Sequence, residues 1–329
     1  MSGVLERDDI DAVLVTTGDR WHATASICAA RAGKDIYCEK PCAMNIQECQ
    51  ELDDNIKKHE RVFQAGTQRR SVPNFRLAAD LALKGKLGQM KEVHAGILQL
   101  QNYLDPLPAQ AEPDPAIINW DKWLGPAPKM PFNEAYCRGR WRNHQGLYSA
   151  WRLPEWGSHT IDLCQWAADA DGTTPIEFEA ESDSLLHARY ANGIKLVMRL
   201  SSGKGVGDWI KGLGTCPVRF VGDEGWVEAG DHLGIKSSHP KLLKGKLNKQ
   251  IRGTDPALHI RNFLDCVKSR KQTACNSTAV RYGHMACFAA AISWKLGRKV
   301  VFDPKKESFV NDTEANGLRT YKRRIPYTI

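Results

Sequence analysis

DAVLVTTGDRWHATASICAARAGKDIYCEKP, residues 11–41, carries the strongest indication of the fold in this sequence. It opens with a β-branched run, Asp11 to Thr17, typical of a parallel strand that is buried on both faces. A helical pattern from about Arg20 to Ala32 follows and ends at Gly33, a residue common just after a helix. A second short strand, Asp35 to Pro41, is stopped by its proline. The stretch therefore predicts a strand–helix–strand unit.

The same alternation continues with a helix from about Ile46 to His59 and a third strand from Arg61 to Gln68. Short links between such elements predict right-handed crossovers and a parallel sheet, here half of a doubly wound one. From about Pro73 the pattern changes to meandering strands, two of them joined by a hairpin turn at Asn192-Gly193, and these favour an open antiparallel sheet. Further helices are expected at residues 74–83, 156–168, 259–269 and 277–296.

Length and composition indicate an ordinary globular protein. The 329 residues suffice for two domains, and 42% hydrophobic with 26% charged residues is usual. The longest apolar run, about Met285 to Trp294, falls far short of the roughly 20 residues that span a bilayer. The first residues contain no apolar segment typical of a signal peptide. We therefore expect no membrane association and a cytoplasmic location.

Ten cysteines and a net charge of +8 invite other interpretations. No CxxC occurs, and several cysteines lie in helical apolar patterns, so we expect reduced, buried thiols and a reducing compartment. The basic residues concentrate between Lys241 and Arg252 and between Arg319 and Arg324. Because no recognition helix, finger or aromatic platform accompanies them, we interpret them as solvated loops and expect no nucleic-acid partner.

The glycine-rich turn that usually binds a dinucleotide is not found in this sequence. Neither GxGxxG nor GxxxxGK[ST] occurs among the 329 residues. The first predicted strand also starts close to Met1, as though earlier strands were missing. The first unit therefore lacks the turn at which the pyrophosphate of a dinucleotide is usually bound.

Polar residues nevertheless gather where the three predicted strands end. They lie in Thr16 to His22, in Glu39-Lys40-Pro41 and in Gly66 to Arg69. The carboxyl ends of parallel strands meet at one edge of a sheet, which is where α/β proteins bind ligands. Lys40 stands out because Pro41 stiffens its turn, and a lysine in a dry pocket can exchange a proton near neutral pH. A lysine after a strand is, however, more often a solvated surface residue.

A second polar group lies on the helix predicted to begin near Trp156. Glu155 and His159 are four residues apart and Asp162 lies three further on, so all three share one helix face. A carboxylate that orients an imidazole suits general acid–base chemistry. Alternatively, the acid complements a helix N-terminus and the histidine belongs to the core. A metal site made of the three residues is a further alternative, although no other ligands with zinc-like spacing are present.

Several of these segments together resemble one family. TTGDRWHA, AGKDIYCEKP, GTQRR, LGQMKEVHAG, EWGSHTIDLCQW, FLDCVKSRK and LGRKVVFDPKKE are similar to the Gfo/Idh/MocA oxidoreductases, from about Asp8 to Ile329. The resemblance implies an incomplete Rossmann-type parallel sheet in residues 1–72. It implies an α/β domain with a large, mostly antiparallel sheet in residues 73–329. That open sheet is expected to form a homodimer or homotetramer.

The resemblance also implies roles for individual residues. Lys40 would lie near the nicotinamide and the substrate hydroxyl, and His159 would be the general base. Glu155 would be its partner acid, where the family commonly has aspartate. Cofactor contacts are expected from Thr16, Thr17, Asp19, His22, Glu39, Lys40 and Gln68. Substrate contacts are expected from Lys40, Trp156, His159 and Asp162, and no metal is expected.

The implied function is oxidation of a sugar, polyol or cyclitol hydroxyl with NAD or NADP, impaired by the missing glycine-rich turn. An NAD-dependent glycosidase of the same fold is one alternative. A non-catalytic sugar-binding protein is another.

Overall fold

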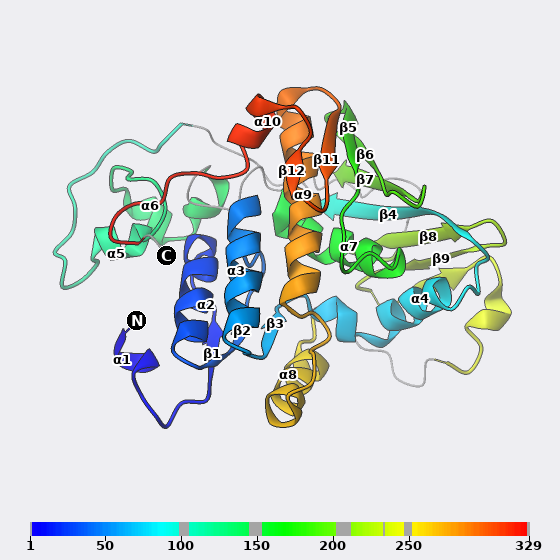
Figure 1. Ribbon diagram of the computed structural model, residues 1–329, viewed down its shortest axis with the longest axis horizontal. Coiled ribbons are helices and arrows are strands. Elements are labelled where there is room, and N and C mark those ends of the chain that lie inside the picture. Colours follow the sequence, from blue (N-terminus) through cyan, green and yellow to red (C-terminus); the bar gives the residue numbers. More distant parts are fainter. Residues whose placement is uncertain are drawn as a thin grey trace.

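The computed structural model describes residues 2–98, 105–144, 153–201, 212–232, 234–246 and 252–327. Its first unit is a three-stranded parallel sheet in the order β1 (Ala12–Val15), β2 (Asp35–Cys38) and β3 (Phe63–Ala65). The crossovers run through α2 (His22–Arg31) and α3 (Ile46–Lys58), which lie side by side in Figure 1. The predicted parallel unit is confirmed.

Local sequence explains where these helices begin and end. The side chain of Asn45 accepts a hydrogen bond from the Glu48 backbone N–H at the start of α3, satisfying one of the unpaired donors there. Gly33, with φ of +77°, follows α2, as its sequence position predicted. Leu14 of β1 is 64% exposed at the free edge of the sheet, and an apolar hollow of about 990 Å³ lies beside it.

The second unit contains a nine-stranded sheet in the order β10-β9-β8-β4-β7-β6-β5-β11-β12. All neighbouring strands are antiparallel except β4 and β7, so the predicted mostly antiparallel sheet is confirmed. Gly193, with φ of +90°, forms the predicted hairpin between β6 and β7. The strands are β4 (Met90–Leu98), β5 (Glu177–Ser182), β6 (Leu185–Arg189), β7 (Lys195–Ser201), β8 (Val218–Gly222), β9 (Trp226–Ala229), β10 (Ile235–Ser237), β11 (Val300–Asp303) and β12 (Ser308–Phe309).

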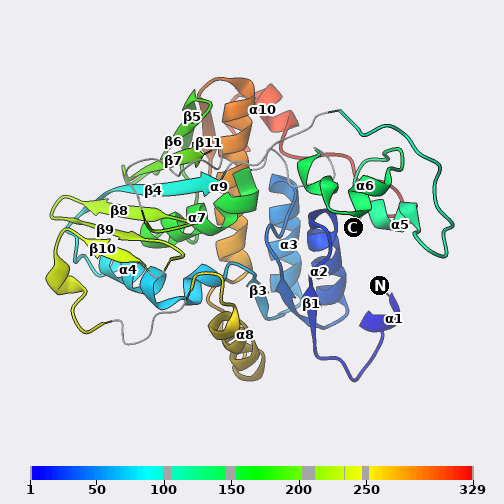
Figure 2. The ribbon, with the colours of Figure 1, turned by 180° about the vertical axis from the view of Figure 1, so that it is seen from behind.

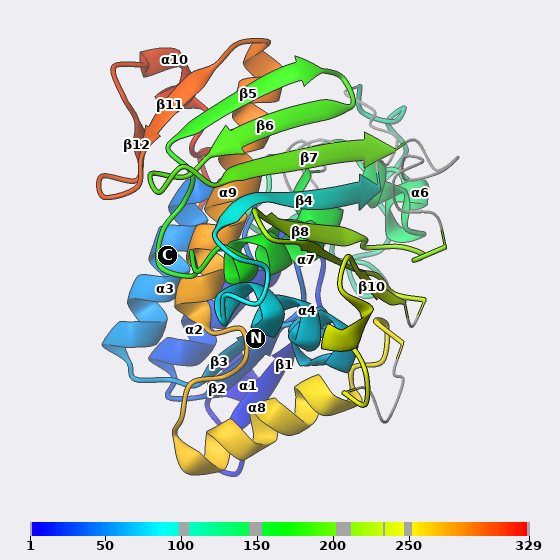
Figure 3. The same cartoon turned by 90° about the vertical axis from the view of Figure 1, so that its right-hand side faces the viewer.

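Three helices cover one face of this sheet. They are α4 (Pro73–Leu83), α7 (Leu153–Ala167) and α9 (Ser277–Leu296). In Figure 3 the sheet faces the viewer and α7 and α9 lie behind it. Because α9 also packs against α3, it stands between the two units (Figure 1). The association of copies through the open sheet stays a prediction.

The end of the chain returns to the first unit, a contact that the division at residue 72 did not anticipate. The Ala65 N–H donates to the Cys275 carbonyl oxygen at 3.0 Å, and Thr273 Oγ1 donates to the Phe63 carbonyl oxygen at 2.6 Å. Helix α8 (Ala257–Ser269) adds a hydrogen bond from Gln64 Nε2 to the His259 carbonyl oxygen. One edge of the parallel sheet is thereby covered by residues from the carboxyl-terminal part of the chain.

The aromatic segment without a clear period forms a small cluster of its own. Trp120, Phe132 and Tyr136 pack together around α5 (Trp120–Leu124) and α6 (Glu134–Cys137), beside α2 in Figure 2. The carboxyl-terminal segment contacts this cluster through an ion pair between Arg324 and Asp121 of α5, with 2.6 Å between the charged atoms.

Two sequence expectations concern the surface of the molecule. The part of the chain that the structure describes contains no helix long and apolar enough to cross a membrane. Of the basic stretch that begins at Lys241, residues 247–251 lie outside the described ranges.

Candidate active site

The three strand ends meet at one edge of the parallel sheet, as predicted. The Glu39 N–H donates to the Val15 carbonyl oxygen at 2.9 Å, and the Gly66 N–H donates to the Cys38 carbonyl oxygen at 2.7 Å. A Cβ atom on Gly66 would lie 2.6 Å from a Glu39 carboxylate oxygen, so a larger residue there would displace the Glu39 side chain. The Glu39-Lys40-Pro41 turn thus lies between the ends of β1 and β3, next to Val15 and Gly66.

Lys40 contacts the helix that carries the second predicted group. Its Nζ donates to the Glu155 carbonyl oxygen at 2.9 Å and lies 3.0 Å from the Glu155 carboxylate. The Lys40 side chain is only 16% exposed, so it is not the solvated surface lysine of the alternative interpretation. The Trp156 ring centroid lies 5.6 Å from Nζ. The first turn of α7 and the lysine turn therefore form one site.

His159 lies on α7 one turn beyond Glu155 and is 3% exposed. Its ring centroid is 6.4 Å from that of Trp156. Burial, together with the nearby positive charges of Arg69 and Lys40, holds the pKa of His159 well below its ordinary value. The imidazole is therefore neutral at physiological pH and is in the state that accepts a proton.

The expected pairing of Glu155 with His159 is not what the structure places here. The Glu155 carboxylate faces Lys40, and His159 Nδ1 has no hydrogen-bond partner within the described residues. Sharing a helix face is not sufficient for contact, because Lys40 approaches Glu155 from another element. Glu155 thus forms an ion pair with Lys40, and its carboxylate does not orient the His159 imidazole.

Arg69 belongs to the strand-end segment Gly66 to Arg69, but the sequence reasoning gave it no role of its own. It is buried, and its Nε and Nη2 donate to the two Asp231 carboxylate oxygens at 3.1 and 2.8 Å. Asp231 also accepts a hydrogen bond from Thr215 Oγ1. The only sequence signal for Arg69 was its place in GTQRR at a strand end, and nothing in the sequence pointed to Asp231.

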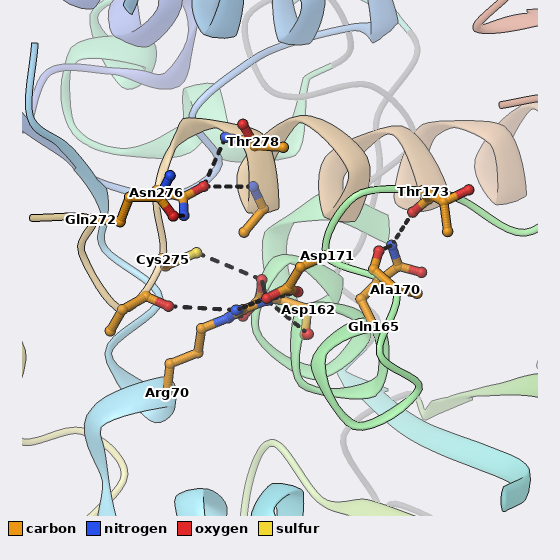
Figure 4. A network of polar contacts seen from close by, with 12 residues as sticks. Arg70, Asp162, Gln165, Ala170, Asp171, Thr173, Gln272, Cys275, Asn276 and Thr278 are labelled. Carbon is orange, nitrogen blue, oxygen red and sulfur yellow. Dashed lines mark hydrogen bonds and ion pairs between the residues drawn. The ribbon is translucent and has the colours of Figure 1, made fainter. Parts of the chain in front are cut away.

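The neighbouring Arg70 contacts Asp162 of α7 and Asp171 just beyond it (Figure 4). Its Nε and Nη2 donate to the Asp162 carboxylate at 2.7 and 2.8 Å, and its Nη1 and Nη2 each lie 2.7 Å from the Asp171 carboxylate. Cys275 Sγ lies 3.6 Å from Asp162. The Asp162 carboxylate is therefore buried and paired with Arg70. These contacts do not support the substrate role that the resemblance implied for Asp162.

The predicted cofactor residues divide into two kinds. Thr16 and Thr17 are exposed, and Glu39 and Gln68 are half-buried. Burial raises the pKa of Glu39, and the Gln68 Oε1 atom has no partner in the described part of the chain. Asp19 and His22 are instead buried, and both His22 ring nitrogens contact backbone carbonyl oxygens.

His284 on α9 holds the backbone just after the lysine turn. Its Nε2 accepts a hydrogen bond from the Cys42 N–H at 3.0 Å. Burial lowers the pKa of His284 from 6.5 to about 4. Because the folded-state pKa is the lower one, the unfolded chain binds the proton first, and stability is lost as pH falls from 6.5 towards 4.

We therefore expect His284→Gln to weaken the acid sensitivity of folding. Glutamine keeps an acceptor for the Cys42 N–H but does not titrate. Between about pH 7 and about pH 4.5, the loss of unfolding free energy should be smaller than in the wild type by about 2–3 kcal/mol. Urea denaturation at both pH values measures this, with the exposed His239→Gln as control. Equal losses in all three proteins would contradict the assignment.

Two family models match this chain. Residues 1–67 match the model of the oxidoreductase family's NAD-binding Rossmann fold, and residues 101–329 match that of its C-terminal α/β domain. The chain belongs to the Gfo/Idh/MocA oxidoreductase family. The resemblance and the fold predicted from the Gfo/Idh/MocA motifs are thereby confirmed, whereas the domain boundary at residue 72 stays a prediction.

Individual relatives align over short segments. An inositol 2-dehydrogenase of Klebsiella pneumoniae (strain 342) is 39% identical over 67 residues, which are 20% of this chain and 20% of that protein. The aligned segments span 20–25% of the length of the curated relatives reported first.

Solved structures of the Gfo/Idh/MocA type share the fold over more of the chain. Levoglucosan dehydrogenase, in complex with NADH and levoglucosan, covers 91% of this chain and 82% of its own, with 16% identity and a TM-score of 0.65. The WlbA dehydrogenase of Chromobacterium violaceum, in complex with NADH and UDP-GlcNAcA, covers 92% and 81%, with 16% identity and a TM-score of 0.64.

The residues at the three strand ends fit the nicotinamide half of such a cofactor. Thr16 and Thr17 offer exposed hydroxyl groups, and the unpartnered Gln68 Oε1 offers an acceptor. Ribose hydroxyls and a carboxamide require partners of these kinds. The motif GxGxxG does not occur in the sequence, and the groups named here concern the nicotinamide half of the cofactor.

Proposed function

We propose that this chain oxidises a secondary hydroxyl of a sugar, polyol or cyclitol with NAD or NADP as hydride acceptor. The proposal rests on one observation: Lys40 and His159 both lie next to Trp156. Lys40 is paired with Glu155, and His159 is buried and neutral. A proton donor or acceptor and an orienting cation in one water-poor site are what hydroxyl oxidation needs.

The proposed roles follow from charge and position. The residues at the strand ends would hold the nicotinamide, which when bound would supply the hydride-accepting chemistry. Lys40 donates a hydrogen bond to the substrate oxygen and fixes its position, while Glu155 holds the Lys40 ammonium group in place. His159 removes the hydroxyl proton as the C–O bond becomes a carbonyl, and ends as an imidazolium ion. Trp156 supplies an apolar wall for the ring face of the substrate.

The finer part of the proposal concerns cofactor affinity. The motif GxGxxG, which elsewhere brings backbone N–H groups to the pyrophosphate, does not occur in this sequence. We expect the chain to bind NAD(H) more weakly than micromolar, as measured by fluorescence titration. Micromolar or tighter binding would contradict this part of the proposal and leave the hydride-transfer chemistry standing.

The function is tested with a panel of cyclitols, hexoses, anhydrosugars and chromogenic glycosides at high concentrations of NAD or NADP. Formation of the reduced nicotinamide with at least one member, and its loss in His159→Asn, is the expected result. His187→Asn, on the sheet at β6, is the matched control and should keep full activity. Release of an aglycone without net reduction would favour the glycosidase, and nucleotide-independent sugar binding without turnover would favour the binding protein. Either outcome contradicts the oxidoreductase.

A further inference from the structure

His22, the first residue of α2, joins two of the three strand ends. It is 2% exposed. Its Nδ1 lies 2.8 Å from the carbonyl oxygen of Pro41, and its Nε2 lies 2.9 Å from the carbonyl oxygen of Thr17. Pro41 follows Lys40, and Thr17 belongs to the loop after β1. One imidazole therefore connects the lysine turn with the neighbouring loop.

The chemistry of these partners restricts the protonation state of the ring. A carbonyl oxygen only accepts hydrogen bonds, and a neutral imidazole carries a single N–H. In the neutral ring, one nitrogen lone pair would therefore face a carbonyl oxygen at hydrogen-bond distance, away from water, and that contact is unfavourable. An imidazolium ion instead donates to both carbonyl oxygens.

We propose that His22 is held as an imidazolium ion and acts as a positioning residue that fixes the Lys40 turn against the Thr17 loop. This inference rests on the proposed function in so far as Lys40 and Thr17 belong to that site. His22 does not touch the substrate. It sets the separation of two backbone segments from which the site is built.

Two other buried histidines provide an internal contrast. His259 Nε2 lies 2.7 Å from the Ala65 carbonyl oxygen, but its Nδ1 contacts the Ser71 hydroxyl, which can donate. His284 Nε2 accepts from the Cys42 N–H and must therefore be unprotonated. Both rings are satisfied when neutral, and burial lowers the pKa of each to about 4. Only His22 of these three has carbonyl oxygens at both ring nitrogens.

Charges around His22 act in both directions. The Glu39 carboxylate, just after β2, favours the cation. The N-terminus of α2 opposes it, because the helix dipole is positive there. The Cys38 thiol and His284 also lie within electrostatic range of the ring. The neutral ring can donate to only one of the two carbonyl oxygens, whereas the cation donates to both. We infer that these two contacts outweigh the opposing charges and favour the cation.

The proposal is tested by long-range ¹H–¹⁵N correlation spectra of the full chain labelled with ¹⁵N-histidine, recorded near neutral pH. Signals are assigned through His22→Gln, His259→Gln and His284→Gln. We expect both His22 nitrogens at the imidazolium position, whereas His259 and His284 each show one protonated and one bare nitrogen. A bare nitrogen on His22 near neutral pH would overturn the proposal.

The wild-type spectrum alone carries this result, so a His22 variant that folds poorly does not weaken the test. If His22→Gln does not yield folded protein, the His22 signals are those left after the other histidines have been assigned by their own variants. The measurement requires neither cofactor nor substrate. The two proposals can therefore fail separately. A neutral His22 in an active dehydrogenase would overturn only the role of His22, and a charged His22 in an inactive protein would overturn only the proposed function.

Discussion

Lys40→Met is expected to lower the turnover number by about 10²–10⁴-fold, the range usual for loss of a positioned proton-transfer or orienting group. Methionine keeps the apolar stem of the lysine but not its ammonium group. The substrate oxygen then loses its donor, and the Glu155 carboxylate loses its partner at 3.0 Å. Steady-state kinetics on the substrate identified by the panel measures the effect.

Lys84→Met is the matched control for this experiment. Lys84 is 66% exposed and pairs with Asp80 one turn away, so its loss should leave turnover within twofold. Circular dichroism would show that both variants fold. If Lys40→Met keeps turnover within a few-fold of the wild type, Lys40 has no role in the reaction.

Arg70→Met is expected to reduce the free energy of unfolding by about 3–5 kcal/mol, the usual effect of removing one partner of a buried ion pair. Arg70 is buried between Asp162 and Asp171, and its loss leaves the Asp162 carboxylate inside the protein without a cation. Burial already raises the pKa of Asp162, and the missing charge should raise it further. Urea denaturation near neutral pH measures the loss.

Arg298→Met provides a control with the same number of acidic partners. Arg298 pairs with Asp312 and Glu314 but is 41% exposed, so water replaces the lost contacts. We expect a loss of unfolding free energy far smaller than that of Arg70→Met, because solvent screens the exposed pairs. Equal losses for the two variants would show that the network in Figure 4 does not hold α7 in place.

The parts of the fold that depend on local pattern were predictable. Apolar β-branched runs and Gly33 marked β1 and α2, and helix α9 begins and ends at the predicted residues, Ser277 and Leu296. The meeting of the strand ends followed from the geometry of parallel sheets alone. The sequence also predicted that Lys40 and the helix bearing His159 belong together, although only through the family resemblance.

Contacts between distant segments could not be predicted in this way. Arg69 and Asp231 are separated by 162 residues, and no periodicity relates them. The partner of Glu155 depends on which cation reaches it, and four-residue spacing pointed to His159 whereas the structure gives Lys40. The aromatic cluster around Trp120 has no sequence period because ring packing and Arg324 hold it, not one amphipathic helix.

The central claim is that Lys40 and His159 act on one substrate hydroxyl in one site. A double-mutant cycle tests it most directly, with turnover measured for Lys40→Met, His159→Asn and the combined variant. Residues that act as a unit show strongly non-additive effects, so the combined variant should be about as slow as the slower single variant. A combined loss equal to the product of the two single losses would show that the residues act independently, and would contradict the account.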